Sequence, residues 1–294
     1  MAVLTQEQVD FMKARAGFGG LIVTAASYPQ ANGIGLPGQY SVARDSDVEG
    51  LSQLAQAMKS KGAKAILQVA HSGREAAIAA QQGLRVVAPT KMDFPWIKYP
   101  ISEMSEEDIE TLIADFGKAA QRAIKAGFDG IEIHNCNHDL VQQFFSAYSN
   151  KRTDQWGGSF EKRMALPLAI IKELHRVISA SDKPDFIIGL RISPEEIHGE
   201  NVGYTVDDML KQTKMVFDAG IDYLKLSLTG LEYRYDSKPA DHDQTFAQLF
   251  HAIMPKNVPL YIGSQVHTPA DVNAALKDAD GVYMAREALI VSRR

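Results

Sequence analysis

The sequence predicts a single (β/α)8 barrel, on three observations. Short apolar runs rich in β-branched residues alternate along the chain with amphipathic helical patterns, which is the rhythm of right-handed βαβ units. The runs are continuously apolar, as is typical of parallel strands buried on both faces. No linker, charge block or low-complexity tract divides the 294 residues, so residues 1–294 are expected to form one domain. The predicted strands are residues 20–25, 63–69, 130–133, 185–192, 221–226, 259–262 and 281–284.

Helical patterns with recognisable start and stop signals lie between these runs. Ser105 precedes three acidic residues, as an N-cap does, and apolar residues then recur every three or four positions as far as Ile124. Gly127 stands just past this helix and before the next strand. Thr268 followed by Pro269 places proline at the first position of a later helix. The alternation of strand and helix is therefore supported at the helix ends as well as by periodicity.

Seven strands are one fewer than this barrel requires. Only a helix-like stretch at residues 5–16 precedes the first run, and the chain stops shortly after the last one. We therefore expect a barrel that lacks its N-terminal strand and has a truncated C-terminal helix, leaving two unpaired edges. Residues 71–104 separate the second run from the next helix, and we expect them to form a loop or hairpin over the barrel mouth that shapes access to it or simply covers its rim.

Composition excludes several classes of protein. The chain is 45% hydrophobic and 23% charged, which argues against disorder, and its net charge of −5 argues against a nucleic-acid or membrane-surface binder. The single cysteine, Cys136, excludes an internal disulfide and a multi-cysteine metal site. No apolar run approaches the roughly 20 residues that span a bilayer, and the N-terminus lacks a secretory signal pattern. We expect a cytoplasmic protein with no nucleic-acid or membrane partner.

Polar residues gather where the predicted strands would reach the C-terminal end of the barrel, the end that carries active sites. Burying such groups without partners is costly, so a polar ligand is the economical explanation. Gly263 and Ser264 form a turn after one strand that leaves backbone N–H groups available for a ligand, and Arg286 follows the next strand. Phosphate sites of barrels are commonly built from these two loops. The other polar residues at strand ends are Gln68, His71, Arg74, His134, Asn135, Asn137, Arg191 and Ser193.

Two stretches also carry a family resemblance. Residues 131–137 read IEIHNCN, and residues 150–163 read NKRTDQWGGSFEKR. Together they resemble the old yellow enzyme family of FMN-dependent ene-reductases, and more closely its NADH-dependent flavin oxidoreductases. The resemblance implies an enzyme that takes hydride from NADH or NADPH and delivers it from flavin N5 to an activated alkene or a similar small electrophile. A homo-oligomer is compatible with it. Shorter matches are LQVAHSGR at residues 67–74, VAPT at residues 87–90 and QF at residues 143–144.

The resemblance implies roles for individual residues. Gln68 would bind the flavin pyrimidine edge, and Arg191 would place a positive charge near flavin N1 and O2. His134 and Asn137 would hold the substrate carbonyl or nitro oxygen, where two donors stabilise an enolate. Taken alone, the same two residues could be a core histidine and an N-cap. The remaining matches are Ala25 and Ala26 beside the flavin ring, and Gly263, Ser264, Ala285 and Arg286 at the phosphate, with Ala285 where the family usually has glycine.

The sequence departs from the family pattern in two ways. Asp139 stands where the family usually has a proton-donating tyrosine. A carboxyl group donates a proton at neutral pH only if burial keeps it protonated. Otherwise Asp139 would face solvent or pair with His138, and water or another residue would protonate the substrate. The absent strand normally reaches the flavin as well, so we expect this chain to bind FMN weakly or not at all.

Two alternatives remain open. A metal-dependent barrel hydrolase is suggested by His134 and His138 at spacing i, i+4 with Asp139 beside them, although no strand carries His-x-His, and we assign no metal ligand. A truncated, non-catalytic barrel that binds flavin weakly is the other. His198 lies on a later loop, where a role in shaping the substrate site and a plain surface role are equally compatible with its position.

Overall fold

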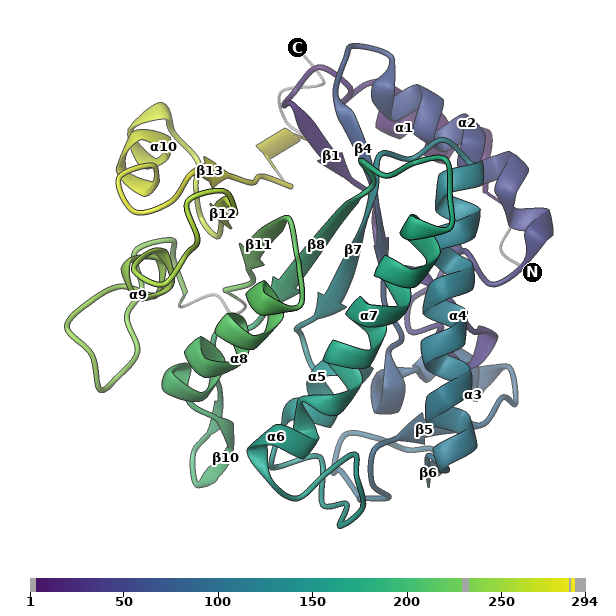
Figure 1. The fold of residues 1–294 in the computed structure, drawn as a ribbon, viewed down its shortest axis with the longest axis vertical. Coiled ribbons are helices and arrows are strands. Elements are labelled where there is room, and N and C mark those ends of the chain that lie inside the picture. Colours follow the sequence, from purple (N-terminus) through teal and green to yellow (C-terminus); the bar gives the residue numbers. More distant parts are fainter. Residues whose placement is uncertain (1–3, 229–232, 286, 289–294) are drawn as a thin grey trace.

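The structure, a computed structural model, describes residues 4–228, 233–285 and 287–288 (Figure 1). All seven predicted strands are present and every pair among them is parallel, with neighbours in the order β13-β12-β11-β8-β7-β4-β1. The fold is of the (β/α)8 barrel class, as predicted. The strands are β1 (Leu21–Val23), β4 (Lys64–Val69), β7 (Gly130–Asn135), β8 (Ile187–Ile192), β11 (Tyr223–Leu226), β12 (Leu260–Ile262) and β13 (Gly281–Val282).

The ring of strands is not continuous within the described part of the chain. No strand there pairs with both β1 and β13, and the absence of an N-terminal strand stays a prediction. Two short strands, β2 (Ser27–Tyr28) and β3 (Tyr40–Ser41), extend the sheet beyond the end of β4, where Ser27 pairs with Val69. The expected truncation of the C-terminal helix concerns residues 289–294, which lie outside the described residues.

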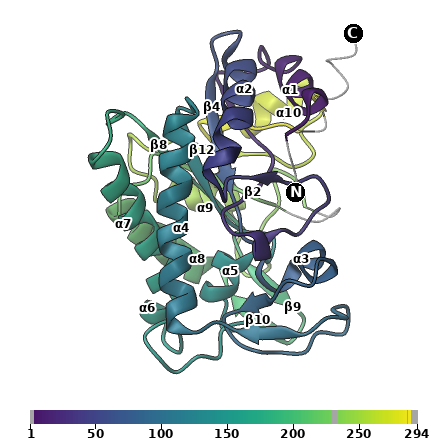
Figure 2. The same ribbon diagram turned by 90° about the vertical axis from the view of Figure 1, so that its right-hand side faces the viewer.

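Helices cover the outer face of the sheet. In Figures 1 and 2, α4 (Glu106–Lys125) and α7 (Ala165–Ser179) lie side by side across it. Ser105 is the N-cap of α4, as predicted, because its hydroxyl accepts a hydrogen bond from the backbone N–H of Asp108. The other helices are α1 (Gln6–Lys13), α2 (Val48–Lys59), α3 (Ala77–Gln81), α5 (Leu140–Phe145), α6 (Phe160–Arg163), α8 (Val206–Asp218), α9 (Phe246–His251) and α10 (Pro269–Ala275), with short 3-10 turns η1 (Ala31–Gly33), η2 (Asp45–Asp47) and η3 (Gly73–Glu75).

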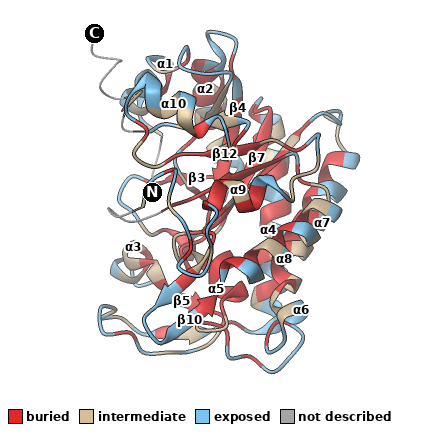
Figure 3. Cartoon of the chain, turned by 90° about the vertical axis from the view of Figure 1, so that its left-hand side faces the viewer, coloured by how far each residue is buried: buried red, intermediate tan, exposed pale blue. Residues whose placement is uncertain are grey.

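The main core lies between the sheet and these helices. Figure 3 shows the strands and the inward sides of the helices as buried and the outward sides as exposed. On α4, Ile109, Leu112 and Phe116 are fully buried against the sheet, which follows from their spacing of three and four residues. Burial of each such side chain contributes about 1.5–3 kcal/mol. This core fixes the strand ends from which the site is built.

Residues 71–104 form a small subdomain beside the strand ends. They contain η3, α3 and two strands, β5 (Val86–Ala88) and β6 (Ile101–Glu103), which pair in parallel and so do not form a simple hairpin. A second apolar core joins this segment to Tyr28 and Ile34 and includes Val86, Phe94 and Ile101. After β8, a true hairpin follows, with β9 (Glu196–His198) antiparallel to β10 (Asn201–Tyr204). In Figure 1, β5 and β6 lie at the lower right and β10 at the lower left.

None of the helices within the described residues has the length and apolar character needed to cross a membrane.

Candidate functional site

His134 lies at the end of β7, with its side chain buried. Its Nδ1 is 2.8 Å from Oδ2 of Asp139, which immediately precedes α5. The expectation that Asp139 faces solvent or pairs with His138 is therefore wrong. The side chain of Asp139 is mostly buried, and its carboxylate lies against the His134 imidazole at the strand end. Asp139 thus orients the histidine ring.

Asn137 follows on the turn between β7 and α5 and lies beside His134. Its Nδ2 is 3.4 Å from His134 Nε2, while its Oδ1 accepts a hydrogen bond of 3.0 Å from the Ser227 hydroxyl. Its backbone N–H donates to Ser193 Oγ at 3.1 Å, which holds the residue at a φ of 56°. Asn137 is not the N-cap of α5, since Asp139 takes that position. The amide and the imidazole are therefore adjacent, and both border one cavity.

The charge on His134 is set by its neighbours. Burial opposes the charged form, but Cys136 and Asp139 together raise the pKa of the His134 imidazole to about 10. Cys136 is fully buried, with its Sγ 3.3 Å from His134 Nε2. Burial raises the pKa of this thiol, but His134 and Arg191 lower it further than burial raises it. A protonated His134 offers a donor at both ring nitrogens.

Two of the predicted flavin-binding side chains, Gln68 on β4 and Arg191 on β8, belong to the strands that flank β7. Gln68 pairs in register with Glu132, and His134 with Arg191. The Arg191 guanidinium donates to Ser227 Oγ at 2.9 Å, and its buried Nε has no hydrogen-bond partner among the described residues. Burial opposes its charge, but Cys136, Tyr283 and Glu132 raise the pKa of Arg191. The strand register therefore brings Gln68, His134 and Arg191 to neighbouring positions.

A buried charged cluster supports this group, and the sequence analysis missed it. Glu132 is fully buried, and its Oε2 is 2.8 Å from Lys225 Nζ and accepts a 2.8 Å hydrogen bond from Tyr223. The Gln68 amide donates to the other carboxylate oxygen. Burial raises the pKa of Glu132, but Lys225, Arg191 and Gln68 lower it below its usual value. The available signal was a charged residue inside each of two apolar strand runs.

The predicted phosphate residues follow β12 and β13. The backbone of Gly263 approaches β13 so closely that a Cβ would lie 2.7 Å from the Tyr283 ring. Ser264 has a φ of 82° and donates its hydroxyl hydrogen to the Leu228 carbonyl. Ala285 is exposed, and Arg286 lies outside the described residues. At the other end of the sheet, Ala25 is exposed, and Ala26 borders the cavity.

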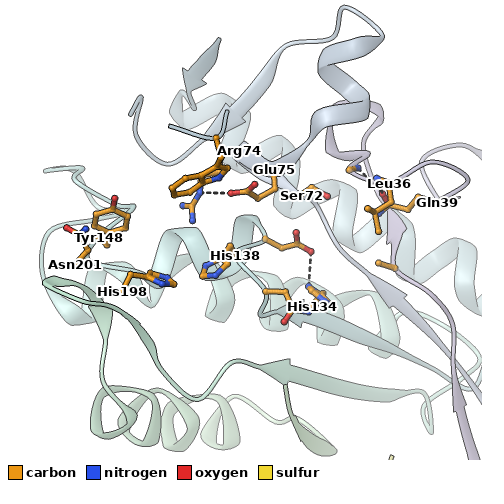
Figure 4. A pocket seen from close by; sticks show the side chains of 15 residues that line it. Leu36, Gln39, Ser72, Arg74, Glu75, His134, His138, Tyr148, His198 and Asn201 are labelled. Carbon is orange, nitrogen blue, oxygen red and sulfur yellow. Dashed lines mark hydrogen bonds and ion pairs between the residues drawn. The ribbon is translucent and has the colours of Figure 1, made fainter. Parts of the chain in front are cut away.

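A cavity of about 620 Å³ lies over the strand ends (Figure 4). His134, Asn137 and Asp139 form its floor, and Ser72, Arg74, Glu75 and Trp96 of the subdomain form one wall. Arg74 is only 3% exposed, and its Nε is 3.0 Å from Glu75 Oε1. Residues 71–104 therefore shape the cavity, as expected. Gln68, Arg191, Gly263, Ser264 and Ala285 do not line it.

The structure does not assemble the metal group that the hydrolase alternative requires. His134 and Asp139 pair with each other, whereas His138 faces Glu196, with its Nδ1 3.9 Å from Glu196 Oε1. Burial, Arg74 and His198 lower the pKa of His138 more than Glu196 raises it. The two histidines therefore belong to different groups, although they are four residues apart.

The sequence of residues 2–291 matches the family model described as the NADH:flavin oxidoreductase / NADH oxidase family. The chain belongs to this family. It is 36% identical over 288 residues to the probable NADH-dependent flavin oxidoreductase YqiG of Bacillus subtilis, covering 98% of this chain and 76% of YqiG. It is 41% identical over 227 residues to the NADH:acrylate oxidoreductase of Vibrio harveyi, covering 76% of this chain but only 22% of that protein.

Solved structures agree with this assignment. The old yellow enzyme homologue from Zymomonas mobilis superposes with a TM-score of 0.80 at 25% identity, covering 97% of this chain and 80% of the homologue. Morphinone reductase in complex with tetrahydroNAD gives a TM-score of 0.77 at 25% identity, covering 97% and 78% of the two chains. The protein is thus an NAD(P)H-dependent flavin oxidoreductase that uses FMN, as the sequence resemblance implied.

The residues at the strand ends suit FMN. The unpartnered, buried Nε of Arg191 is a donor that requires an acceptor, and its positive charge suits a ring that gains electrons. Ala25 is exposed and Ala26 borders the cavity, and both side chains are small. The sequence resemblance assigns the flavin ring to Gln68, Arg191, Ala25 and Ala26, and this assignment stays a prediction.

Proposed function

We propose that this enzyme reduces an alkene conjugated to a carbonyl or carboxylate group, with NADH or NADPH as the reductant. The observation that carries the proposal is the His134–Asn137 pair, whose Nε2 and Nδ2 atoms lie 3.4 Å apart at one cavity. FMN, when bound, would supply the hydride-transfer chemistry that links nicotinamide oxidation to alkene reduction. The residues of this chain bind the substrate and stabilise the charge that develops on its oxygen.

The two donors act on a single substrate oxygen. Hydride addition to the β-carbon leaves an enolate, whose negative oxygen is best stabilised by fixed donors already aimed at it. Asp139 keeps the His134 ring oriented, and Cys136 and Asp139 together favour its protonated form, so Nε2 carries a proton beside the Asn137 amide. Ser227 does not contact the substrate in this proposal. Its hydroxyl donates to Asn137 Oδ1 and so orients the amide, whose Nδ2 can then donate to the substrate oxygen.

Asp139 is a positioning residue in this proposal and not the proton donor. Its carboxylate is engaged with His134 Nδ1 at 2.8 Å. The proton that completes reduction at the α-carbon then comes from water that enters through the cavity. Water thus donates the proton that a tyrosine, usually present in the family where Asp139 stands, would otherwise supply.

The walls of the cavity favour an anionic substrate. Arg74, His138 and His198 all border it and supply a guanidinium and two imidazole groups. Two relatives are named for NADH:acrylate and NADH:fumarate oxidoreduction, and both of those compounds are alkenes conjugated to a carboxylate. The chain covers 22% and 24% of these two relatives, so we take from them only the substrate class.

The test is alkene-dependent oxidation of NADH or NADPH by the FMN-loaded protein under anaerobic conditions. We expect His134→Ala and Asn137→Ala each to lower kcat by about 10²–10³-fold, the usual effect of removing one oxyanion donor. The control is His251→Ala on α9, outside the cavity. Flavin absorbance should be retained in all three variants. Wild-type rates in both site variants would overturn the assignment.

A flavin titration followed by fluorescence addresses the remaining alternative. The sequence analysis expects weak FMN binding or none, whereas this proposal requires stoichiometric FMN in the purified chain or on titration, so the titration decides between them. Failure to bind FMN at micromolar concentrations would favour the truncated, non-catalytic barrel instead.

A further inference from the structure

His138, Glu196 and His198 lie together in the wall between two cavities. His138 and His198 border the large cavity over the strand ends. Both also border a second cavity of about 170 Å³, which Glu196, Ser193 and Tyr233 line as well. Figure 4 shows the two imidazoles beside each other, and their ring centroids are 5.1 Å apart. This group is separate from the His134–Asp139 pair.

The fold itself brings the three side chains together. Glu196 and His198 are two residues apart on β9, and alternation along a strand places them on the same face. Pairing of β9 with β10 keeps that strand in place. His138 comes from the turn after β7, where its φ of 64° is in the left-handed region that a non-glycine residue rarely adopts.

Gln142 links two members of the group. Its Oε1 accepts a 2.8 Å hydrogen bond from the His138 backbone, and its Nε2 donates to Glu196 Oε2 at 3.2 Å. The glutamine is itself 1% exposed, so its position is fixed by packing. One carboxylate oxygen of Glu196 is therefore held, and the other is left to face His138.

The second carboxylate oxygen of Glu196, Oε1, indicates a ligand because it has no hydrogen-bond partner among the described residues. Glu196 is 2% exposed, yet its buried Oε1 accepts no hydrogen bond from any described residue. The nearest basic atom is His138 Nδ1 at 3.9 Å, which is also buried and has no hydrogen-bond partner in the described part of the chain. An unpaired buried carboxylate is strongly unfavourable. A cation between these atoms would satisfy both of them.

We propose that His138, Glu196 and His198 bind a divalent transition metal ion of the zinc type. One ligand atom from each residue already lies within 4.8 Å of the other two. Tetrahedral coordination with bonds near 2.1 Å would bring them to about 3.4 Å from one another, so the closure required is about 1.5 Å or less. The exposed His198 can make that movement by rotation of its side chain, while Glu196 stays held by Gln142.

The donor set determines the class of metal. Two imidazoles and a carboxylate favour Zn²⁺ and its neighbours over Mg²⁺ or Ca²⁺, which prefer oxygen ligands alone. Three protein ligands leave a fourth position open, as in catalytic zinc sites. In this wall the open position faces the cavities, where a water or a substrate carboxylate oxygen would occupy it.

The test measures metal binding directly. The FMN-loaded protein is treated with chelator, dialysed and titrated calorimetrically with ZnCl₂, and the same samples are titrated with Co²⁺ to record its visible d–d absorption. We expect one ion per chain and a cobalt spectrum typical of fewer than six ligands. Because removal of even supporting groups weakens metal sites by about 10–100-fold, His198→Asn and Glu196→Gln should each weaken binding at least tenfold.

The matched control is His251→Asn, an exposed histidine on α9 that borders neither cavity. It should leave the affinity unchanged. Since His198 is exposed, its substitution leaves the core intact and keeps the test valid even if Glu196→Gln folds poorly. Absence of zinc binding, or equal affinity in the wild type and His198→Asn, would overturn the proposal. Neither readout depends on turnover, so the result is independent of the proposed reductase activity.

Discussion

The two sides of the barrel mouth are built very differently. β7 and β8 are six residues long and pair along their whole length, and all six residues of β7 are buried. β12 and β13 have three and two residues, and Met284 and Ala285 just beyond them are exposed. The side that would grip the substrate oxygen is thus fixed by protein contacts. On the predicted phosphate side the strands are short, and bound FMN would add local stability there.

The largest effect is expected from breaking the buried ion pair under the substrate side. Lys225→Met leaves Glu132 charged and buried, which should lower the free energy of unfolding by about 3–5 kcal/mol. Urea unfolding measures this loss. Lys214→Met, at an exposed position on α8, should change the free energy of unfolding by less than about 0.5 kcal/mol.

A double variant sharpens the same point. Adding Glu132→Gln to Lys225→Met removes the orphaned charge and should recover a large part of the loss. If Lys225→Met alone is as stable as the wild type, the substrate side does not depend on this cluster and the contrast between the two sides fails.

The phosphate side should respond to a single methyl group. In Gly263→Ala the new Cβ would lie 2.7 Å from the Tyr283 ring, and overpacking of this kind costs about 1–3 kcal/mol. We expect a lower melting temperature and weaker FMN binding, measured by fluorescence titration. The control is Gly20→Ala, where the Cβ would meet nothing within 4 Å. Unchanged FMN affinity in Gly263→Ala would show that this turn does not contact the cofactor.

The smallest expected effect is a shift in pH dependence on the substrate side. The pKa of His134 is about 10, above the reference of 6.5, so its protonated form predominates at neutral pH and is lost as the pH rises through about 10. The stability that this charge contributes is complete below pH 6.5 and disappears over the same rise. Asp139→Asn removes one cause of the raised pKa, so the alkaline limb of kcat/KM should move to lower pH.

The control for this profile is Asp218→Asn, an exposed carboxylate at the end of α8. Its alkaline limb should coincide with that of the wild type. An Asp139→Asn profile that also coincides with the wild type would mean that Asp139 does not govern the charge on His134.

The fold was predictable because its signals are local. Apolar runs, the Ser105 cap and the glycine after α4 each act within a few residues, and together they located all seven strands. The closeness of His134 and Asn137 was predictable for the same reason, since both follow one strand. The resemblance then added the FMN and NAD(P)H dependence that no local pattern carries.

The side-chain partners within the site could not be predicted, because they depend on contacts between distant parts of the chain. The partner of Asp139 is decided by the direction in which its side chain leaves the N-terminus of α5, which spacing does not reveal. Glu132 and Lys225 meet only because β7 and β11 both flank β8. Glu196 joins His138 across 58 positions through the β9–β10 hairpin, so the cluster has no sequence signature.

The subdomain of residues 71–104 has its own apolar centre and its own strand pair, and it returns to the barrel at α4. The side chains of this second core can therefore be exchanged with little effect on the helices that enclose the sheet, whereas Val87 and Met104 of the same segment pack in the main core. Arg74 and Trp96 line the cavity from this subdomain, whereas His134 and Asn137 line it from β7 and the turn that follows. Related enzymes could accordingly diversify what they accept by remodelling one insertion, while the reaction chemistry beneath it is inherited unchanged.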